Sequence, residues 1–269
     1  MTCCCLEELT FGHEYDLPFA DTILDDNNNV ISRVLPDSLT ELHFGNRFNQ
    51  VFGVNILPSR LCELTFMDQF NQINDSVFPT SLETLELGCY FDEEIKQHVL
   101  PPALTSLKFG AFYNRSFKKR TLPTTLKRVE FGVYYNKEVK PHTLPHGLTE
   151  LVFKGNFNKQ FQVGALPITL KRLEFTGVPE YNKPFLKDVL PKSLKYLKLP
   201  HNFRYVDHNI LSLPELRYLC MYYDDPQKLT VLPPKLKYLI IYCEKNTLDY
   251  KLLPPTIEYL QVAGKVEIG

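Results

Sequence analysis

The chain has 269 residues, 20 of them proline, with 44% hydrophobic side chains, no Trp and a formal net charge of −1. This proline-rich composition argues against a helical bundle, and the near-neutral charge gives no overall case for binding nucleic acid or an anionic membrane. No apolar run approaches eighteen residues, and the N-terminus "MTCCCLEELTF" lacks the basic start and long apolar segment of a signal peptide. We therefore expect a soluble protein.

A repeat organises the chain. A Leu-Pro pair, once replaced by Phe-Pro, recurs in steps of 19 to 24 residues. This period is typical of leucine-rich repeats, whereas tetratricopeptide units need about 34 residues and propeller blades about 40 or more. We predict a single solenoid domain over 1–269, with about twelve coils of about 22 residues each. The prolines that mark the coils are Pro36, Pro58, Pro79, Pro101, Pro123, Pro145, Pro167, Pro191, Pro214, Pro233 and Pro254.

Residues 1–35 form the first predicted coil, which carries a polar insertion over 13–34. Its strand letters begin at Leu6, and about eleven extra residues precede Pro36, including "DDNNN" at 25–29. A solenoid needs a cover over its end coil, because an open end exposes core and strand edge. The insertion is interpreted either as a mobile flap or as that cover, which would use Phe19, Ile23, Leu24, Val30 and Ile31.

Residues 36–189 are regular coils in which three apolar letters have fixed offsets, as in Leu39, Leu42 and Phe44. The last two letters alternate with a variable one, which is the period of a short strand with one buried face. One strand per coil predicts a parallel β-sheet on the concave face. The return to the next Leu-Pro is short, so we expect an extended, 3₁₀ or irregular convex side with little α-helix.

The letters after each predicted strand have structural explanations. A glycine often follows the strand, as at Gly45 and Gly110, where we expect a positive φ to turn the chain. An aromatic ring and an amide then recur, and we expect the rings to stack and the amides to satisfy backbone groups of their own and adjacent coils. These structural ladders contain Phe48, Phe70, Phe91, Tyr113, Tyr135, Phe157 and Tyr181, and Asn49, Asn71, Asp92, Asn114, Asn136, Asn158 and Asn182.

Residues 190–269 are degenerate coils that keep the Leu-Pro pair and the strand letters. The letter that opens the strand is tyrosine in four successive coils, and a cation precedes three of them. Tyr and Arg are enriched at interface hot spots, but stacked tyrosines on neighbouring strands can equally stabilise the sheet itself. Both interpretations stay open and are compatible. The candidate binding residues are Tyr196, Tyr218, Tyr238, Tyr259, Lys195, Arg217, Lys237 and Arg172.

The regular coils share the pattern LxxLxFGxxFN, followed by Gln50-Val51 in one coil and Gln72-Ile73 in the next, and then Leu-Pro. From Leu6 to about Asn182 this pattern resembles the FNIP repeat family, a leucine-rich-repeat-like group of social amoebae and giant DNA viruses. The resemblance implies a leucine-rich-repeat solenoid without enzymatic activity. From Leu194 onward the strand letters persist, but the FN element decays to "FRYVDH" and then disappears.

No catalytic signature accompanies the repeat. GxGxxG, phosphate-loop, GxSxG, HExxH and CxxC motifs are all absent from the sequence, so we expect no catalytic residue, cofactor or metal. The nearest approach to a ligand cluster is His201, Asp207 and His208, which we interpret as a surface turn. Basic residues beside aromatics can hold single-stranded nucleic acid. Glu215 and Glu258 interrupt the patch, so we expect no nucleic-acid partner.

The expected function is a non-catalytic scaffold that binds a protein of unknown identity through the concave face of the C-terminal coils. The alternative is a self-associating structural protein, a homodimer through uncapped solenoid ends. Opposite charges would assist such a contact, since residues 1–122 carry −8 and residues 123–269 carry +7. The seven cysteines are an odd number, and four of them fall at scattered positions in the repeat, which predicts reduced thiols. We expect a cytoplasmic location, in the host cytoplasm if the source is viral, without membrane contact.

Overall fold

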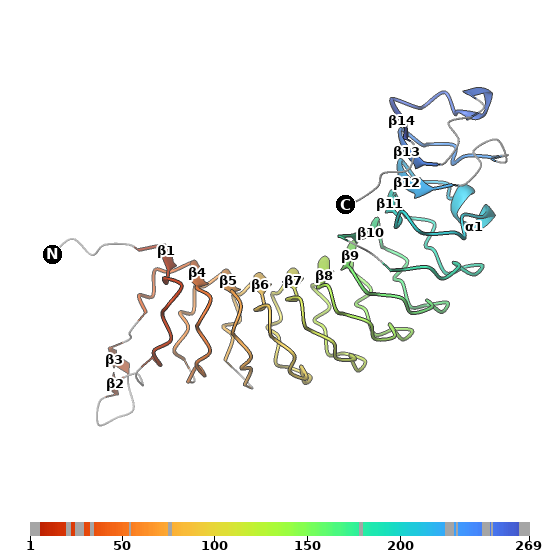
Figure 1. Cartoon of the computed structure of the whole chain (residues 1–269). Coiled ribbons are helices and arrows are strands. Elements are labelled where there is room, and N and C mark those ends of the chain that lie inside the picture. The colour runs from red at the N-terminus through yellow and green to blue at the C-terminus, as the bar shows by residue number, and fades with distance from the viewer. Residues whose placement is uncertain are drawn as a thin grey trace. The chain divides into compact units, whose positions relative to one another are not determined.

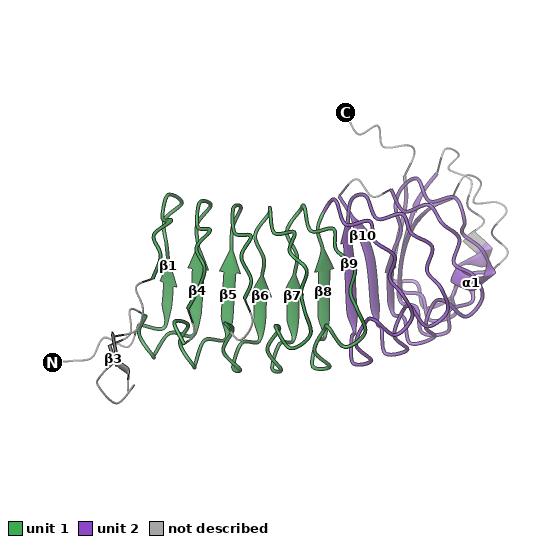
Figure 2. Cartoon of the chain, turned by 90° about the horizontal axis from the view of Figure 1, so that it is seen from below, with its two compact units in different colours: residues 1–132 green, residues 133–269 purple. Residues whose placement is uncertain are grey.

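The computed structural model describes residues 6–19, 23–24, 30–32, 35–53, 55–74, 77–177, 180–223, 229, 231–243, 248 and 250–263. Contacts divide the chain into two compact units, residues 1–132 (unit 1) and 133–269 (unit 2) (Figure 2). Each unit is a run of coils that contribute one strand apiece to a parallel sheet (Figure 1). The predicted class, a leucine-rich-repeat-type solenoid with little helix, is confirmed.

Unit 1 contains a parallel sheet in chain order. Its strands pair in register, so that the first residue of each lies beside the first residue of the next, as in Glu8, Glu41 and Glu63. The strands are β1 (Glu8–Thr10), β4 (Glu41–Phe44), β5 (Glu63–Phe66), β6 (Thr84–Glu86), β7 (Ser106–Lys108) and β8 (Arg128–Phe131). Within the predicted insertion, β2 (Ile23–Leu24) and β3 (Val30–Ser32) form a separate antiparallel pair.

Unit 2 continues the pattern with longer strands. They are β9 (Glu150–Lys154), β10 (Arg172–Thr176), β11 (Tyr196–Lys198), β12 (Tyr218–Tyr222), β13 (Tyr238–Tyr242) and β14 (Tyr259–Ala263). The helices of the described chain are the four-residue α1 (His208–Leu211) and the 3₁₀ turn η2 (Tyr250–Leu252). Short return segments with many prolines leave no room for longer helices.

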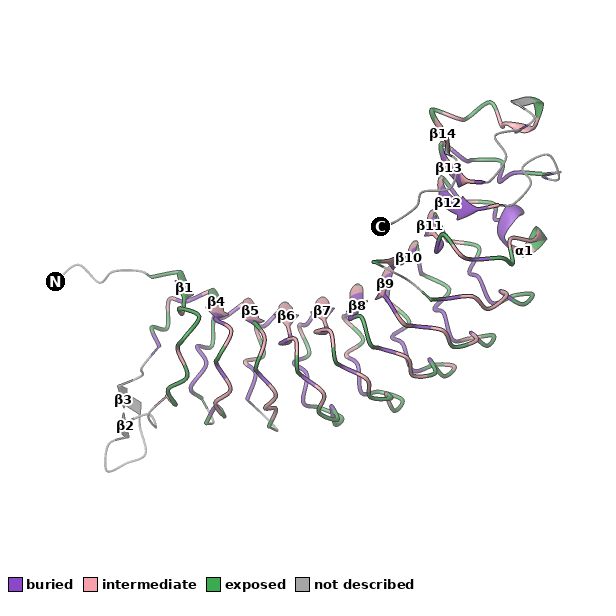
Figure 3. Ribbon diagram, in the orientation of Figure 1, coloured by how far each residue is buried: buried purple, intermediate pink, exposed green. Residues whose placement is uncertain are grey.

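The strands form because alternate letters are apolar. Leu42, Leu64 and Leu85 in the middle of their strands are completely buried, while the residues beside them face outward (Figure 3). Burial of one such side chain stabilises the folded state by about 2 to 3 kcal/mol. The strand side of each unit therefore presents the variable letters.

Proline turns the chain into each strand. The Pro36 carbonyl accepts a hydrogen bond from the Leu39 N–H at 3.2 Å, and the same Pro-x-x-Leu bond recurs at Pro58, Pro123 and Pro191. Proline lacks an N–H, so it fits this corner and not the ladder itself. In six coils the residue three positions before the proline has a positive φ. These residues are Asn55, His98, Arg120, His142, Gly164 and Asp188.

The residue before each strand is locked by the backbone of the next coil. The Thr40 carbonyl accepts hydrogen bonds from the N–H groups of Cys62 and Glu63, at 2.8 and 2.9 Å. The Lys171 carbonyl does the same for Lys195 and Tyr196, also at 2.8 and 2.9 Å. The backbone of two residues per coil is thereby held in place where the strand begins.

The expectation of a positive φ at the glycines after the strands was wrong. The left-handed glycines are Gly155, Gly164 and Gly177, and Gly45, Gly88, Gly110 and Gly132 are not among them. A side chain at Gly110 would instead place its Cβ 1.9 Å from the carbonyl oxygen of Gly88. These glycines are required because backbones of adjacent coils approach each other too closely for a Cβ.

Rings and amides run through the interior in series. Phe48, Phe70, Phe91 and Tyr113 stack in unit 1 with centroids 5.9 to 6.5 Å apart. Tyr135, Phe157, Tyr181 and Phe203 do so in unit 2, at 5.9 to 6.1 Å. The series extends one coil beyond the recognisable FN motif, to Phe203.

Beside the rings, a series of amide side chains and one carboxylate accept hydrogen bonds from the backbone N–H groups of the next coil. The Asn49 oxygen accepts from Asn71 N at 2.9 Å, and the Asn158 oxygen accepts from Asn182 N at 3.1 Å. Asn136, Asn71, Asp92 and Asn182 accept in the same way, from Asn158, Asp92, Asn114 and Arg204. One side chain per coil thus ties successive coils together.

The insertion covers part of the first coils. The Phe19 ring stacks on Phe52 at 5.8 Å and packs edge-on against Phe44 at 5.9 Å. Phe19 therefore shields core rings, as a cover would. Residues 25–29, and the side chains of Ile23, Leu24, Val30 and Ile31, lie outside the part that the structure describes.

Candidate interaction face

The strand side of unit 2 carries a tyrosine ladder, defined as Tyr196, Tyr218, Tyr238 and Tyr259. The leucine after each tyrosine in β11, β12 and β13 is completely buried, and this turns the tyrosine outward. Exposure rises along the ladder: Tyr196 and Tyr218 are half-buried, Tyr238 is 42% exposed and Tyr259 is 47% exposed.

The rings of the ladder stack closely at the Tyr196 end and are more widely spaced towards Tyr259. In-register pairing sets Arg172, Tyr196 and Tyr218 side by side. The Arg172 guanidinium lies 3.7 Å from the centroid of the Tyr196 ring, and Tyr218 stacks on Tyr196 at 4.0 Å with planes 8° apart. Tyr238 and Tyr259 follow at 6.4 Å spacing, tilted by about 30°. Both faces of the Tyr196 ring are therefore occupied within the protein.

A buried charge cluster supports the stacked end. Glu174 is 8% exposed and forms ion pairs with Arg172 and, at 3.4 Å, with Lys198. Burial, followed by the hydrogen bond with Tyr196, raises the pKa of Tyr218. Burial also raises the pKa of Cys220 to about 11. The phenol of Tyr218 and the thiol of Cys220 are thus neutral at physiological pH, and the ladder offers hydroxyl groups rather than charge.

A cation directly precedes each of the first three tyrosines of the ladder in the sequence. Lys195 and Arg217 are exposed, and within the described residues neither forms an ion pair. Lys237 pairs with Glu258, and this hydrogen bond lowers the pKa of Glu258. Glu215 is likewise held by Lys235 at 2.6 Å, so the two carboxylates expected to interrupt the patch are already paired. The structure places Arg172 and the four tyrosines in one register row, and Lys195, Arg217 and Lys237 at the residue that precedes a strand.

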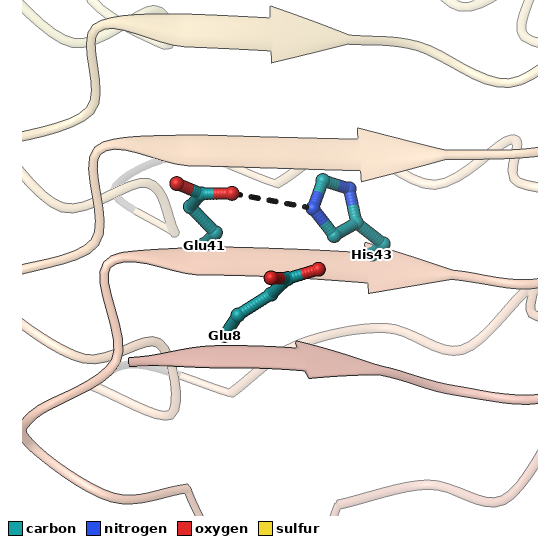
Figure 4. A group of neighbouring side chains, drawn as sticks. All are labelled: Glu8, Glu41 and His43. Atoms are coloured by element: carbon teal, nitrogen blue, oxygen red, sulfur yellow. Dashed lines mark ion pairs between the residues drawn. The ribbon is translucent and has the colours of Figure 1, made fainter. Parts of the chain in front are cut away.

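The strand side of unit 1 carries a group that sequence reasoning missed. Glu8, Glu41 and His43 come from β1 and β4, and one potential ligand atom from each lies within 4.8 Å of the others (Figure 4). His43 Nε2 is 3.9 Å from a Glu41 carboxylate oxygen. Imidazole and carboxylate are ligands that zinc accepts, although all three side chains are accessible to water. The signal was present: Glu8 and Glu41 hold the same repeat letter, 33 residues apart.

The turn around His201, Asp207 and His208 has a structural function. Asp207 is the N-cap of α1, and its side chain accepts a hydrogen bond from Asn209 N at 3.0 Å. Within the described residues these three do not form a group that could hold a metal ion. Capping accounts for the aspartate in this position.

One parallel strand per coil of about 22 residues, with short non-helical returns, defines a leucine-rich-repeat-type solenoid. Residues 27–69, 70–112, 113–155 and 135–177 match the family described as FNIP Repeat. These matches span more than half of the chain. The chain belongs to the FNIP repeat family, and the resemblance predicted from the regular coils is confirmed.

Among solved structures, the chain is similar to CroV588, a giant-virus protein described as a novel circular LRR protein structure. The two share 32% sequence identity with a TM-score of 0.82, over 97% of this chain and 40% of CroV588. The chain thus spans well under half of that protein. A leucine-rich repeat protein from Bacteroides ovatus is 13% identical over 96% of this chain and 66% of its own, with a TM-score of 0.20.

No curated protein matches the chain. Within the described residues, no helix is long and apolar enough to cross a bilayer. The comparisons therefore identify the family and the fold, and the chemistry of the strand side is the basis for the function.

Proposed function

We propose that the chain is a non-catalytic scaffold that binds a protein partner through the strand side of unit 2. The observation that carries this proposal is the tyrosine ladder with its exposed end at Tyr238 and Tyr259. The core residues of the same strands, such as Leu239, are completely buried, whereas Tyr238 and Tyr259 lie outside that core. In unit 1 the corresponding letter is often small or acidic, as at Thr84 and Glu41.

The ladder is suited to a protein surface. Tyrosine presents a large, partly apolar area with few rotatable bonds, so little conformational entropy is lost when a partner binds. Stacking between Arg172, Tyr196 and Tyr218 restricts these side chains before binding. Arg217 beside the ladder adds the charged residue that, together with tyrosine, is enriched in interface hot spots, and Lys195 adds a further donor.

Ring orientation favours protein over single-stranded nucleic acid. A base binds by stacking on a free aromatic face. Arg172 and Tyr218 cover the two faces of Tyr196, which leaves its edge for a partner. Edges and hydroxyls suit the carbonyl, carboxylate and apolar groups of a polypeptide.

Affinity capture from cells of the source organism tests the proposal. The variant Tyr238→Ala/Tyr259→Ala should lose the captured partner by at least about tenfold, as expected for removal of hot-spot residues. The matched control Tyr90→Ala/Tyr205→Ala removes two equally exposed tyrosines outside the strands and should capture normally. Equal capture by both variants and the unaltered chain would exclude this face.

A second candidate function is a structural protein that self-associates through its end coils. Within the described residues β1 pairs only with β4, and β14 only with β13. Leu9 in β1 and Leu260 in β14 are half-buried, whereas Leu42 and Leu239 are completely buried. The circular fold of CroV588 supports this candidate, because a ring leaves no open sheet edge. End contacts would be weakened by Leu260→Asp, measured as a loss of mass by light scattering.

A further inference from the structure

The strand side of the first coils in unit 1 is uniformly acidic. At the strand positions of β1, β4, β5 and β6, and at the residue before each, there are six carboxylates and neither Lys nor Arg. Glu86 pairs with Lys108 of β7, whereas Glu8 and Glu63 form no ion pair within the described residues. We call this set the acid face: Glu7, Glu8, Glu41, Glu63, Glu83 and Glu86.

The equivalent positions in unit 2 have the opposite charge. At β10, β11, β12 and β13 there are six cations and one carboxylate, the buried Glu174. Arg172 and Lys198 pair with Glu174, but Lys171, Lys195 and Arg217 are exposed and form no ion pair within the described part. We call this set the cation face: Lys171, Arg172, Lys195, Lys198, Arg217 and Lys237.

Both faces have the same spacing because the same coil builds them. Glu8, Glu41 and Glu63 are register partners on successive strands, which lie about 4.8 Å apart. Lys171, Lys195 and Arg217 advance by one coil each, held by the hydrogen bonds from Lys195 N and Arg217 N to the preceding carbonyl. Like charges on neighbouring strands repel and destabilise a sheet. Each row would be relieved by an opposite row of equal spacing.

We propose that the partner of the strand side is a second copy of this chain, whose acid face contacts the cation face of the first. The inference rests on the proposed function, because the cation face surrounds the tyrosine ladder. The two faces match in spacing, and each keeps at least three charged side chains that form no ion pair within the described residues.

Such a contact depends on salt. Charges that are partly exposed attract over about 10 Å at 0.1 M ionic strength and over about 3 Å at 1 M. We therefore expect association at low ionic strength and dissociation as salt is raised. The rate of association should fall with salt as well, since opposite faces steer the encounter.

The experiment exchanges the charges. One variant, Lys195→Glu/Arg217→Glu, makes the cation face acidic, and another, Glu8→Lys/Glu63→Lys, makes the acid face basic. Mass is measured by light scattering at about 50 mM salt, an ionic strength at which screening is weak. EDTA is present, so that no metal ion bridges Glu8, Glu41 and His43. The control Lys187→Glu/Lys192→Glu changes the same charge at exposed lysines outside the strands.

The unaltered chain and the control should show at least twice the chain mass of 31.3 kDa. Each charge variant alone should be monomeric, and an equimolar mixture of the two should regain the larger mass. Circular dichroism confirms that the variants are folded. A monomeric unaltered chain, or a mass that neither variant changes, would overturn the inference. A monomer that still captures another protein through Tyr238 and Tyr259 would overturn it and leave the proposed function intact.

Discussion

The regular coils of residues 36–189 contain a stacked series of rings in the interior, whereas the degenerate coils of residues 190–263 also carry a row of tyrosines on the strand side. In the regular coils the rings lie inside, where Phe157 stacks between Tyr135 and Tyr181. In the degenerate coils the described stacked series ends at Phe203, and tyrosines such as Tyr238 stand on the strand side.

This difference separates two uses of the same repeat. An internal ring must fit neighbours above and below, so its position is constrained by packing. The exposed rings of Tyr238 and Tyr259 are less constrained, since their centroids lie 6.4 Å apart and their planes are tilted by 33°. The most regular stretch of sequence is therefore the least informative about function, and loss of the motif marks where the surface changes.

Apart from emptying the interior at Phe157, the largest expected effect is on the close approach of the regular coils. Gly110→Ala should lower the free energy of unfolding by about 3 kcal/mol, because its Cβ would meet the Gly88 backbone and not a movable side chain. Gly12→Ala is the control, since no atom lies within 4 Å of its Cβ position. Urea unfolding of the two variants makes the measurement. Equal stability would show that the coils adjust without cost.

A smaller effect is expected from the amide series. Asn158→Ala leaves the Asn182 N–H, now bonded at 3.1 Å, without its acceptor and should cost about 2 kcal/mol. Arg204→Ala should cost less than about 1 kcal/mol, because the described series ends with the backbone N–H of that residue, which alanine keeps. Thermal unfolding measures the loss of stability in the two variants. If Arg204→Ala lost as much stability as Asn158→Ala, the hydrogen bonds of the amide series would not be what holds adjacent coils together.

The smallest expected effect is a gain in the free energy of unfolding. The Tyr181 hydroxyl is completely buried and has no hydrogen-bond partner among the described residues. Four regular coils use phenylalanine at this letter. Tyr181→Phe should therefore raise stability by about 1 kcal/mol, while the reverse change Phe157→Tyr should lower it. A loss of stability in Tyr181→Phe would reveal a partner for that hydroxyl.

The sequence was sufficient to predict the coil because each structural letter repeats. The Leu-Pro step, the alternation around Leu42 and the FN element together specified a parallel strand, its buried face and the family. The sequence was insufficient where the role of a residue depends on the distance between the backbones of adjacent coils. Gly110 was assigned a positive φ, yet it is required by a backbone contact with a glycine 22 residues earlier.

The candidate site was predictable in its members and not in its geometry. Repeat letters placed Tyr196, Tyr218 and Arg172 in one row, and this row exists. The buried pairing of Arg172 with Glu174 and the stacking order depend on side-chain rotamers, which a repeat pattern does not specify. The group of Glu8, Glu41 and His43 was missed because the insertion separates its strands in sequence.

The central claim is that tyrosines of the degenerate coils serve binding, whereas rings of the regular coils serve stability. The most direct test measures thermal unfolding and partner capture for Tyr238→Ala/Tyr259→Ala beside Phe157→Ala. We predict that the tyrosine variant unfolds within about 3 °C of the unaltered chain and loses capture, because its rings are exposed.

Phe157→Ala should lose about 3 to 5 kcal/mol, or roughly 10 °C, because it empties a packed interior position. A tyrosine variant that is destabilised as strongly as Phe157→Ala, yet captures its partner normally, would contradict the claim and make the ladder a structural element.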